Sequence, residues 1–400
     1  MSKTPIAISF PRPAQQRHLL KRMDACEVLR QLREHDFDSR EMLERHAGLS
    51  SSRLAAAVSF LEKKGLIERT SKGKSNRRNT ALRINAGYGH VLGVDIGGSN
   101  LRIALADMKG KVLGKWSTST KKTSSPGMVI GQIRKGVKNL LEHASVSRRS
   151  LLAVAVGAPG ITDGDAGVVV TTSNLKGWKD VPLRRLLESA LRIPAAVEND
   201  VRMAAIGENW KGSAQGVGNF VFLAIGTGIA AGVFANGRLI HGTDWTAGEV
   251  GYMHVPGAPE TAARRGAPGS LESVIGGQGI RTQWLRSSNG TGVGVTRNLT
   301  ATEIFERARA GDLVARGVLN RSAKILAYAV YNISLVLNCG LFILGGGVGM
   351  STPLRDATQR FLEKYSEPVQ PKLIVSGLGQ DAQLVGAIRL ALSKADQQSV

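Results

Sequence analysis

A glycine turn between two apolar runs is the feature that most constrains the fold. Residues 91–107, VLGVDIGGSNLRIALAD, pass from an apolar run through Asp95 and Gly97-Gly98-Ser99 into a second apolar run. The pattern predicts strand, tight loop and strand, in which glycines let backbone N–H groups approach an anion and Asp95 holds a metal–phosphate or a water. The loop lacks the lysine of a Walker A motif, and a strand rather than a helix follows it. Taken alone, the pattern is also that of an ordinary glycine-rich hairpin.

The same pattern recurs further along the chain. Phe220–Ile225 leads into Gly226-Thr227-Gly228 and another apolar run, and residues 341–344 lead into a glycine run that includes Gly346. Two strand–glycine loop–strand units predict a duplicated fold with a cleft between its halves. Strands and helices alternate through most of the chain, which indicates an α/β protein. Among the later helices, Thr300 and Glu303 predict a capping box, and Gly386 predicts close packing of the last helix.

The first 88 residues differ from the rest in charge. They hold 18 Lys and Arg against 9 Asp and Glu, within a chain of formal net charge +22. After an arm over residues 1–20, we expect a helix capped by Asp24 that ends near Glu34. A second short helix starts at Ser39, with Met42 and Leu43 facing inwards.

The third helix of this region is the one expected to enter a major groove. Its predicted buried stripe is Leu54, Val58 and Leu61, and the residues left facing outwards are Ser51, Ser52, Arg53 and Ala56. Two short strands then flank a basic turn with Lys72, Lys74, Arg77 and Arg78, side chains suited to phosphates or the minor groove. Three helices and a basic hairpin predict a winged helix-turn-helix that binds double-stranded DNA through Ser51, Ser52, Arg53 and the basic turn. The alternative is a helical protein-interaction domain.

Asn199 and Asp200 follow an apolar strand and precede a helix. A carboxylate at that point can take a proton from a sugar hydroxyl while the neighbouring amide binds another hydroxyl. Asp200 is equally suited to capping the helix that begins at Val201.

Five motifs together resemble the ROK family of bacterial sugar kinases and sugar-sensing repressors. They are Asp95-Ile96-Gly97-Gly98, Gly157-Ala158-Pro159-Gly160, Glu198-Asn199-Asp200, Gly226-Thr227-Gly228 and Ala247-Gly248-Glu249. The resemblance implies a two-lobed actin/hexokinase-like (ribonuclease H-like) module after the winged helix-turn-helix. The expected domains are then 1–88, a small lobe of 89–200 with the C-terminal helix 381–400, and a large lobe of 201–380.

The resemblance also implies roles for individual residues. Asp200 would be the general base of a kinase, and the sugar ligands would be Asn199, Asp200, Glu249, Tyr252 and Glu272. The nucleotide phosphates would lie against Asp95, Gly97, Gly98, Ser99, Gly226, Thr227, Gly228 and Gly346, with ATP–Mg bound only if the chain is a kinase. Ala230 and Ala231 stand where the kinases often have further glycines.

The family's structural zinc is not expected in this chain. Its four ligand positions hold Tyr252, Ala263, Arg265 and Ser270. A neutral phenol, an alanine, an arginine and a serine do not replace one histidine and three thiolates around zinc.

Composition places the protein in the cytoplasm. Cys26 and Cys339 are isolated thiols in unlike contexts, so we expect no disulfide, and neither a membrane span nor a signal peptide is evident. The sequence thus predicts a sugar-responsive transcriptional regulator, most simply a repressor, that forms a homodimer or a dimer of dimers. The alternatives are an ATP-dependent sugar kinase, and a partner-binding protein whose sugar and nucleotide sites are relics.

Overall fold

The computed structural model describes residues 13–35, 37, 39–71, 80–121, 123–172, 175–260, 268–288, 298–365 and 367–400. The helices are α1 (Pro13–Glu34), α2 (Arg40–Ala47), α3 (Ser51–Lys63), α4 (Pro126–His143), α5 (Leu183–Leu191), α6 (Asp200–Lys211), α7 (Glu272–Ile275), α8 (Gly277–Ser288), α9 (Ala301–Arg309), α10 (Leu313–Leu337), α11 (Gly346–Gly349), α12 (Thr352–Leu362) and α13 (Ala382–Ser399). Within the described ranges, no helix is both long enough and apolar enough to cross a membrane.

The strands form two five-stranded sheets, one three-stranded sheet and a hairpin. The hairpin pairs β1 (Ile67–Ser71) with β2 (Thr80–Ile84). The first five-stranded sheet has the order β10-β6-β3-β4-β5, from Ala195–Asn199, Leu151–Ala158, His90–Ile96, Asn100–Asp107 and Val112–Ser119. The second has the order β13-β12-β11-β14-β15, from Arg238–Leu239, Ile229–Ala235, Phe220–Ile225, Leu341–Gly345 and Lys372–Val375. The small sheet joins β7 (Ile161–Asp163), β8 (Val168–Thr171) and β9 (Lys179–Val181).

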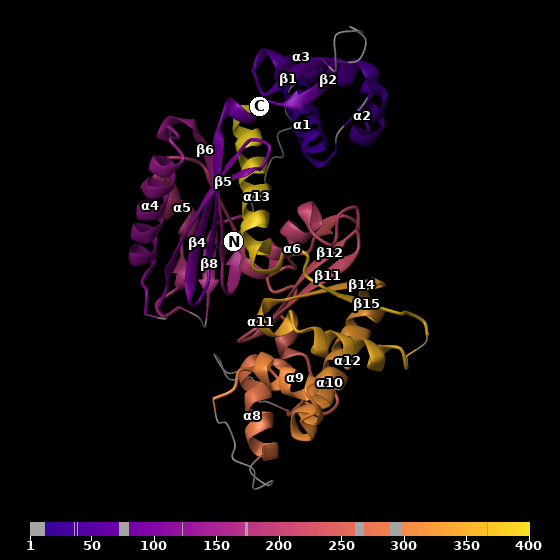
Figure 1. Cartoon of the computed structure of the whole chain (residues 1–400). Helices are drawn as coiled ribbons and strands as arrows, with labels where there is room; N and C mark the ends of the chain where they lie inside the picture. The colour runs from indigo at the N-terminus through magenta and orange to yellow at the C-terminus, as the bar shows by residue number, and fades with distance from the viewer. Residues whose placement is uncertain are drawn as a thin grey trace, which may run out of the picture.

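The two large sheets have the same internal arrangement, which confirms the predicted α/β fold. In each, an antiparallel pair comes from the strand–glycine loop–strand unit: β3 with β4, and β11 with β12. Each unit's first strand also pairs in parallel with a later strand, β6 in the first sheet and β14 in the second. Helices α4 and α5 cover one face of the first sheet and α13 covers the other (Figure 1).

The N-terminal unit, α1 to β2, differs from the sequence prediction at three points. Helix α1 starts at Pro13, where an arm was expected, because proline is tolerated in the first turn and the following residues are good helix formers. Asp24 therefore lies inside α1 instead of capping it. Met42 is 40% exposed, and Leu43 alone of the expected pair is buried, because the short α2 turns only one face inwards.

Other local predictions for this unit and beyond are confirmed. Ser39 caps α2 and the left-handed Gly48 ends it. The stripe Leu54, Val58 and Leu61 is buried in α3, while Ser51, Ser52, Arg53 and Ala56 are exposed. Farther along, Thr300 and Glu303 form the predicted capping box at the start of α9.

Helices α6 and α13 approach each other so closely that only glycine fits at two positions. A Cβ atom on Gly386 of α13 would lie 1.8 Å from the carbonyl oxygen of Met203, and one on Gly207 of α6 would lie 2.2 Å from that of Ala382. The sequence predicted close packing at Gly386, and this contact confirms it. Since α13 also lies against β3 and β6, it fixes α6 relative to the first sheet.

The α6–α13 contact predicts opposite outcomes for two glycine-to-alanine changes. Gly386→Ala drives a methyl group into a backbone carbonyl and should lower the free energy of unfolding by about 3 kcal/mol. The control is Gly317→Ala in α10, where an added Cβ would meet nothing within 4 Å. That change should raise the free energy of unfolding by about 0.5–1 kcal/mol, because alanine is the better helix former. Thermal unfolding of both variants measures this, and equal stability of the two would contradict the packing.

Candidate ligand site at the carboxyl ends of the strands

The predicted site residues gather where parallel strands end. In the first sheet, β3, β6 and β10 run in parallel and end at Asp95–Ile96, at the 157–160 loop and at Asn199. In the second sheet, β11 and β14 run in parallel and end before Gly226 and Gly346. The carboxyl ends of parallel strands are where α/β proteins bind ligands.

Asn199, not Asp200, caps helix α6. Its Oδ1 accepts hydrogen bonds from the backbone N–H groups of Val201 (2.9 Å) and Arg202 (3.0 Å). Its Nδ2 donates to the carbonyl oxygen of Gly160 (2.9 Å) and to Oδ1 of Asp200 (3.1 Å). The interpretation of Asp200 as the cap is therefore wrong, and Asn199 fixes the position of the carboxyl group that follows it.

Four carboxyl groups, Asp95, Asp200, Glu249 and Glu272, influence one another and form what we call the carboxylate cluster. Burial, with the charges of Asp95 and Glu249 adding to it, raises the pKa of Asp200 to about 7. Burial also raises the pKa of Glu249, with Arg202 opposing and Glu272 reinforcing the shift. These groups hold protons more firmly than ordinary carboxyls, a property suited to hydrogen bonding with hydroxyl groups and to proton transfer.

Glu272 connects the carboxylate cluster to the second glycine loop. Its Oε2 accepts a hydrogen bond from the backbone N–H of Ile229 (3.2 Å), and a Cβ atom on Gly228 would lie 2.7 Å from that oxygen. Burial raises the pKa of Glu272, while the Ile229 N–H opposes the shift. The lack of a side chain at Gly228 is what lets the carboxyl group lie there.

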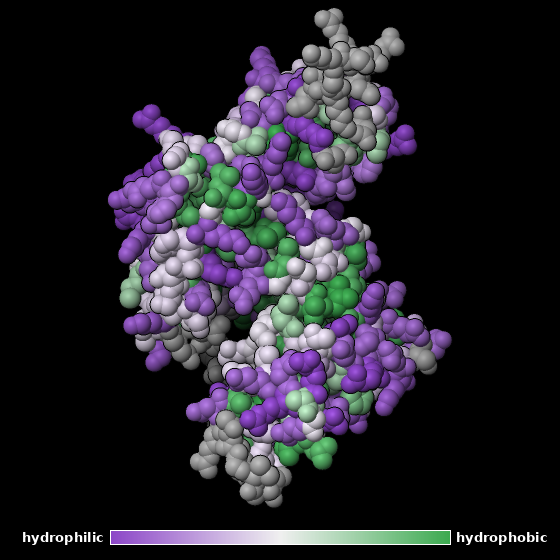
Figure 2. All heavy atoms as spheres, in the orientation of Figure 1, coloured by the Kyte–Doolittle hydropathy of each residue, from purple (hydrophilic) through white to green (hydrophobic). Residues whose placement is uncertain are grey.

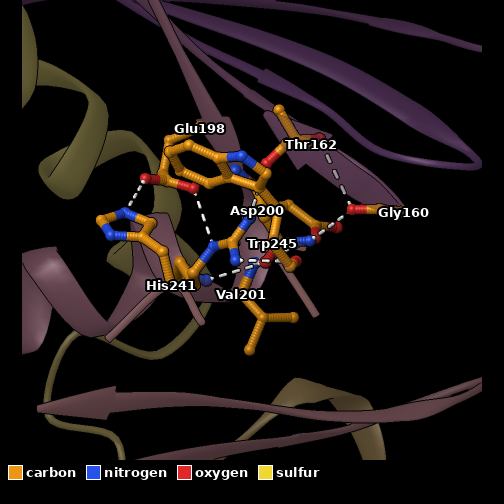
Figure 3. Close-up of polar contacts among 9 residues, drawn as sticks. Gly160, Thr162, Glu198, Asp200, Val201, His241 and Trp245 are labelled. Atoms are coloured by element: carbon orange, nitrogen blue, oxygen red, sulfur yellow. Dashed lines mark hydrogen bonds and ion pairs between the residues drawn. The ribbon is translucent and has the colours of Figure 1, made fainter. Parts of the chain in front are cut away.

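A buried ion network, which the sequence analysis missed, supports the first turn of α6 (Figure 3). Glu198 Oε1 accepts from Nε of Arg202 (2.8 Å), and Glu198 Oε2 lies 2.8 Å from Nε2 of His241. Arg202 also donates to the carbonyl oxygens of Trp245 (3.0 Å) and Thr162 (2.8 Å). The spacing of Glu198 and Arg202, four residues apart, was the available signal.

Asp95 is bound by an arginine from the neighbouring strand. Arg102 donates to Asp95 Oδ2 from Nε (3.0 Å) and Nη2 (2.6 Å), and its side chain also binds Gln380 and Gln383 beside α13. Burial raises the pKa of Asp95, and Arg102 opposes the shift. One of the two oxygens of the carboxyl group that was expected to hold a metal–phosphate or a water is therefore already engaged by a cation.

The glycine loops lie at both sheet ends. Gly97 N–H donates to the carbonyl oxygen of Asn100 (2.8 Å), which closes the β3–β4 turn around Gly98 and Ser99. Gly226 N–H donates to Gly228 O (2.9 Å) across the exposed Thr227. A Cβ atom on the left-handed Gly346 would lie 2.5 Å from Ile225 O, so the second and third loops are adjacent. Their expected contact with nucleotide phosphates stays a prediction.

The family model described as the ROK family matches residues 91–394. The chain belongs to the ROK family. That match contains the carboxylate cluster and all three glycine loops.

ROK relatives of two kinds match this chain. The glucokinase of Halalkalibacterium halodurans is 31% identical over 307 residues, which is 74% of this chain and 92% of that protein. The xylose repressor of Caldicellulosiruptor bescii is 24% identical over 398 residues, which is 94% of this chain and 96% of that protein.

Solved ROK structures share the fold. A ROK family transcriptional regulator, a homologue of the Escherichia coli MLC protein, has a TM-score of 0.81 at 22% identity and covers 95% of this chain and 98% of its own. A ROK family glucokinase from Streptomyces griseus, in complex with glucose and AMPPNP, has a TM-score of 0.64 at 26% identity and covers 76% of this chain and 99% of its own.

The residues at the zinc positions do not fit a zinc ion. Ser270 is buried and its hydroxyl donates to the carbonyl oxygen of Pro259 (2.8 Å), while Tyr252 is 54% exposed. Ala263 and Arg265 lie outside the described residues. Within the described parts of the chain, no three His, Cys, Asp or Glu side chains are grouped to hold a metal.

The predicted DNA-contacting residues are only partly described. Arg53 is half-exposed but bound by Asp24 of α1, with Nε to Oδ2 at 2.9 Å, and Ser51 donates to Glu44 Oε2 (2.9 Å). Ser52 is exposed and interacts with Ser50 (3.2 Å). Lys72, Lys74, Arg77 and Arg78 lie outside the described residues, so their role stays a prediction.

The raised pKa of Asp200 predicts a pH-dependent gain of stability from Asp200→Asn. Because the pKa rises from 3.8 to about 7 on folding, the free energy of unfolding falls as pH rises from about 4 to about 7, and it stays at the lower value above that, where the carboxyl group is ionised in both states. Asparagine keeps the oxygen that accepts from Val201 and carries no charge. We expect the variant to exceed the wild type by up to about 4 kcal/mol at pH 8 and by much less at pH 5. Thermal unfolding at both pH values measures the difference, with Asp165→Asn at an exposed carboxyl as the control.

Proposed function

We propose that this protein is a DNA-binding transcriptional regulator, a repressor, whose affinity for its operator is controlled by a sugar or sugar derivative bound at the carboxylate cluster. The observation that carries the proposal is how much of this chain the repressor relative matches, compared with the kinase relative. A match over 94% of the chain, as with the xylose repressor, must include most of residues 1–90, whereas the glucokinase match covers 74%. The N-terminal unit is therefore what this chain shares with a repressor.

The N-terminal unit has the features that DNA binding requires. Helices α2 and α3 are joined by residues 48–50, and α3 presents Ser51, Ser52 and Arg53 on its exposed side. The region 1–88 has twice as many basic as acidic residues, 18 against 9. Its visible surface is mostly hydrophilic (Figure 2). In our proposal α3 enters the major groove, and a dimer places two copies on a roughly palindromic operator.

The carboxylate cluster has the chemistry for a sugar. Asp200, Glu249 and Glu272 present carboxyl oxygens to hydroxyl groups, and the Streptomyces griseus relative was solved with glucose. Asn199 contributes by holding Asp200, since both polar atoms of its side chain are engaged by α6 and by Gly160. Tyr252, expected as a sugar ligand, is half-exposed, and its backbone N–H donates to the carbonyl oxygen of Glu249 (3.3 Å). Its hydroxyl group makes no hydrogen bond with the described residues.

A continuous set of contacts links the sugar residues to α3. Asp200 begins α6, α6 packs on α13, and α13 binds α1 through the buried pair Asp396–Arg33 and through Arg389–Glu34 at 3.0 Å. Helix α1 holds Arg53 of α3 through Asp24. If a sugar binds the DNA-free arrangement about a hundredfold more tightly, the operator affinity falls by the same factor, or about 2.7 kcal/mol.

A sugar kinase is the second candidate function, favoured by the 31% identity with a glucokinase. Proton removal by Asp200 would be the chain's own contribution to phosphoryl transfer. ADP release with a sugar and ATP–Mg, abolished by Asp200→Asn, would establish that activity. Against it stands the engagement of Asp95 by Arg102.

A negative charge at the start of α3 should weaken DNA binding. Ser52→Asp places a carboxylate against DNA phosphates and should weaken binding at least about tenfold. The matched control is Ser189→Asp, the same change at an exposed position of α5. Gel shifts with a duplex that the wild type selects from a randomised library measure both variants.

The outcomes of that experiment separate the parts of the proposal. Equal binding by the two variants would mean that α3 does not face DNA, and failure to select any duplex would overturn the regulator. Adding neutral sugars, amino sugars and sugar phosphates to the wild-type complex tests the sensing part. We expect one class to release the DNA, and no effect from any of them would contradict control by a sugar.

A further inference from the structure

Trp245 has an unusual backbone conformation for its residue type. Its φ is 60°, in the left-handed region where bulky side chains are rare because Cβ crowds the backbone. Such strain persists only where surrounding contacts hold it, and it gathers at ligand sites. Trp245 lies on the loop between β13 and Glu249, four residues before that member of the carboxylate cluster.

Contacts from helix α6, from the loop after β13 and from the β7–β8 turn hold the indole in one place. The His241 ring meets it edge-on, with centroids 4.8 Å apart, and the Arg202 guanidinium lies 5.7 Å from its centroid. Arg202 also binds the Trp245 carbonyl oxygen. A Cβ atom on Gly164, in the β7–β8 turn, would lie 3.3 Å from the ring. The Trp245 ring thus spans from the loop after β13 to the β7–β8 turn beside the first sheet.

The indole is fixed without being buried in the core. Trp245 is half-buried, and its Nε1–H group has no hydrogen-bond partner among the described residues. It lies in the same group of side chains as Asp200 (Figure 3). A rigid aromatic face and a free donor beside carboxyl groups are complementary to a sugar ring, which has apolar C–H faces and hydroxyl edges.

We propose that Trp245 contacts the ligand and selects it: its indole forms an aromatic wall for the apolar face of an uncharged monosaccharide and excludes the phosphorylated form. This inference rests on the proposed function, because it assumes that a sugar binds at the carboxylate cluster.

The charges around Trp245 support an uncharged ligand. The guanidinium groups described around Trp245 and Asp95 are already bound. Arg202 binds Glu198 and two carbonyl oxygens, and Arg102 binds Asp95 and Gln380. Arg184 binds the carbonyl oxygens of Gly164 and Asp165. Among the charges that act on Asp200 and Glu272 in the described structure, none is a cation. A phosphate dianion would meet carboxyl groups without a free cation to bind it.

Binding measurements on the full-length protein test Trp245 directly. Glucose, xylose and N-acetylmannosamine are titrated beside their phosphate esters, with calorimetry and intrinsic fluorescence as readouts. Three of the other tryptophans, Trp178, Trp210 and Trp284, are at most 6% exposed, whereas Trp116 of β5 is half-buried like Trp245. A fluorescence change that disappears in Trp245→Phe is therefore the one that reports on Trp245. We expect one neutral sugar to bind and its phosphate ester to bind at least about tenfold more weakly.

Three variants separate ligand contact from a structural role. Trp245→Ala and Trp245→Gly should weaken the neutral sugar about tenfold, whereas Trp245→Phe should retain most of the affinity. Trp245→Gly suits the left-handed backbone, so it should fold even if the alanine variant does not. Unchanged affinity in the glycine variant, preferential binding of a phosphate ester, or binding of no neutral sugar would each overturn the proposal.

Gel shifts on the same preparations keep the two proposals apart. Sugar binding that depends on Trp245 without any change in DNA affinity would contradict the regulator and leave this inference standing. Release of DNA by a sugar whose affinity does not depend on Trp245 would contradict this inference and leave the regulator standing.

Discussion

The contact between α6 and α13 is the constraint on which the rest of the arrangement depends. Gly207 and Gly386 let the two helix backbones touch, and no side chain lies between them to absorb a movement. Helix α6 carries Asp200 at its first position, and α13 lies against the first sheet. The distance from Asp200 to that sheet is thus set by backbone contact, which is stiffer than side-chain packing because backbones have no rotamers to exchange.

The same helix ties the N-terminal unit to the ligand site. Arg33 and Asp396 form an ion pair that is almost completely buried, and Arg389 of α13 lies against both Glu34 and the Trp210 ring. A buried ion pair adds little net stability but tolerates few geometries, because its charges must stay matched. This pair therefore couples the position of α1 to that of α13. If a ligand displaced α6, α13 would transmit most of that displacement to α1.

Patterns among residues close in sequence predicted most of the fold and part of the site. The glycine loops, the Thr300–Glu303 capping box and the stripe of α3 involve residues close in sequence, so their patterns predicted them. The features that were missed join distant segments. Asp24 was read as a helix cap because its partner, Arg53, lies 29 residues away, and Glu198 gave no sign of meeting His241, 43 residues later. Periodicity carries no information on such pairs.

Two acids at the junction of β10 and α6 have opposite electrostatic environments, and this difference suits a binding site. Glu198 has its charge matched by Arg202 and both its oxygens engaged, so it serves to hold the turn in place. Among the described residues no cation acts on Asp200, two positions along, and burial raises its pKa to about 7. A ligand hydroxyl that donates to Asp200 would stabilise its ionised form and lower that pKa again, so binding and ionisation must be linked. The fixed ion pair lets Asp200 change its charge without disturbing the helix that carries it.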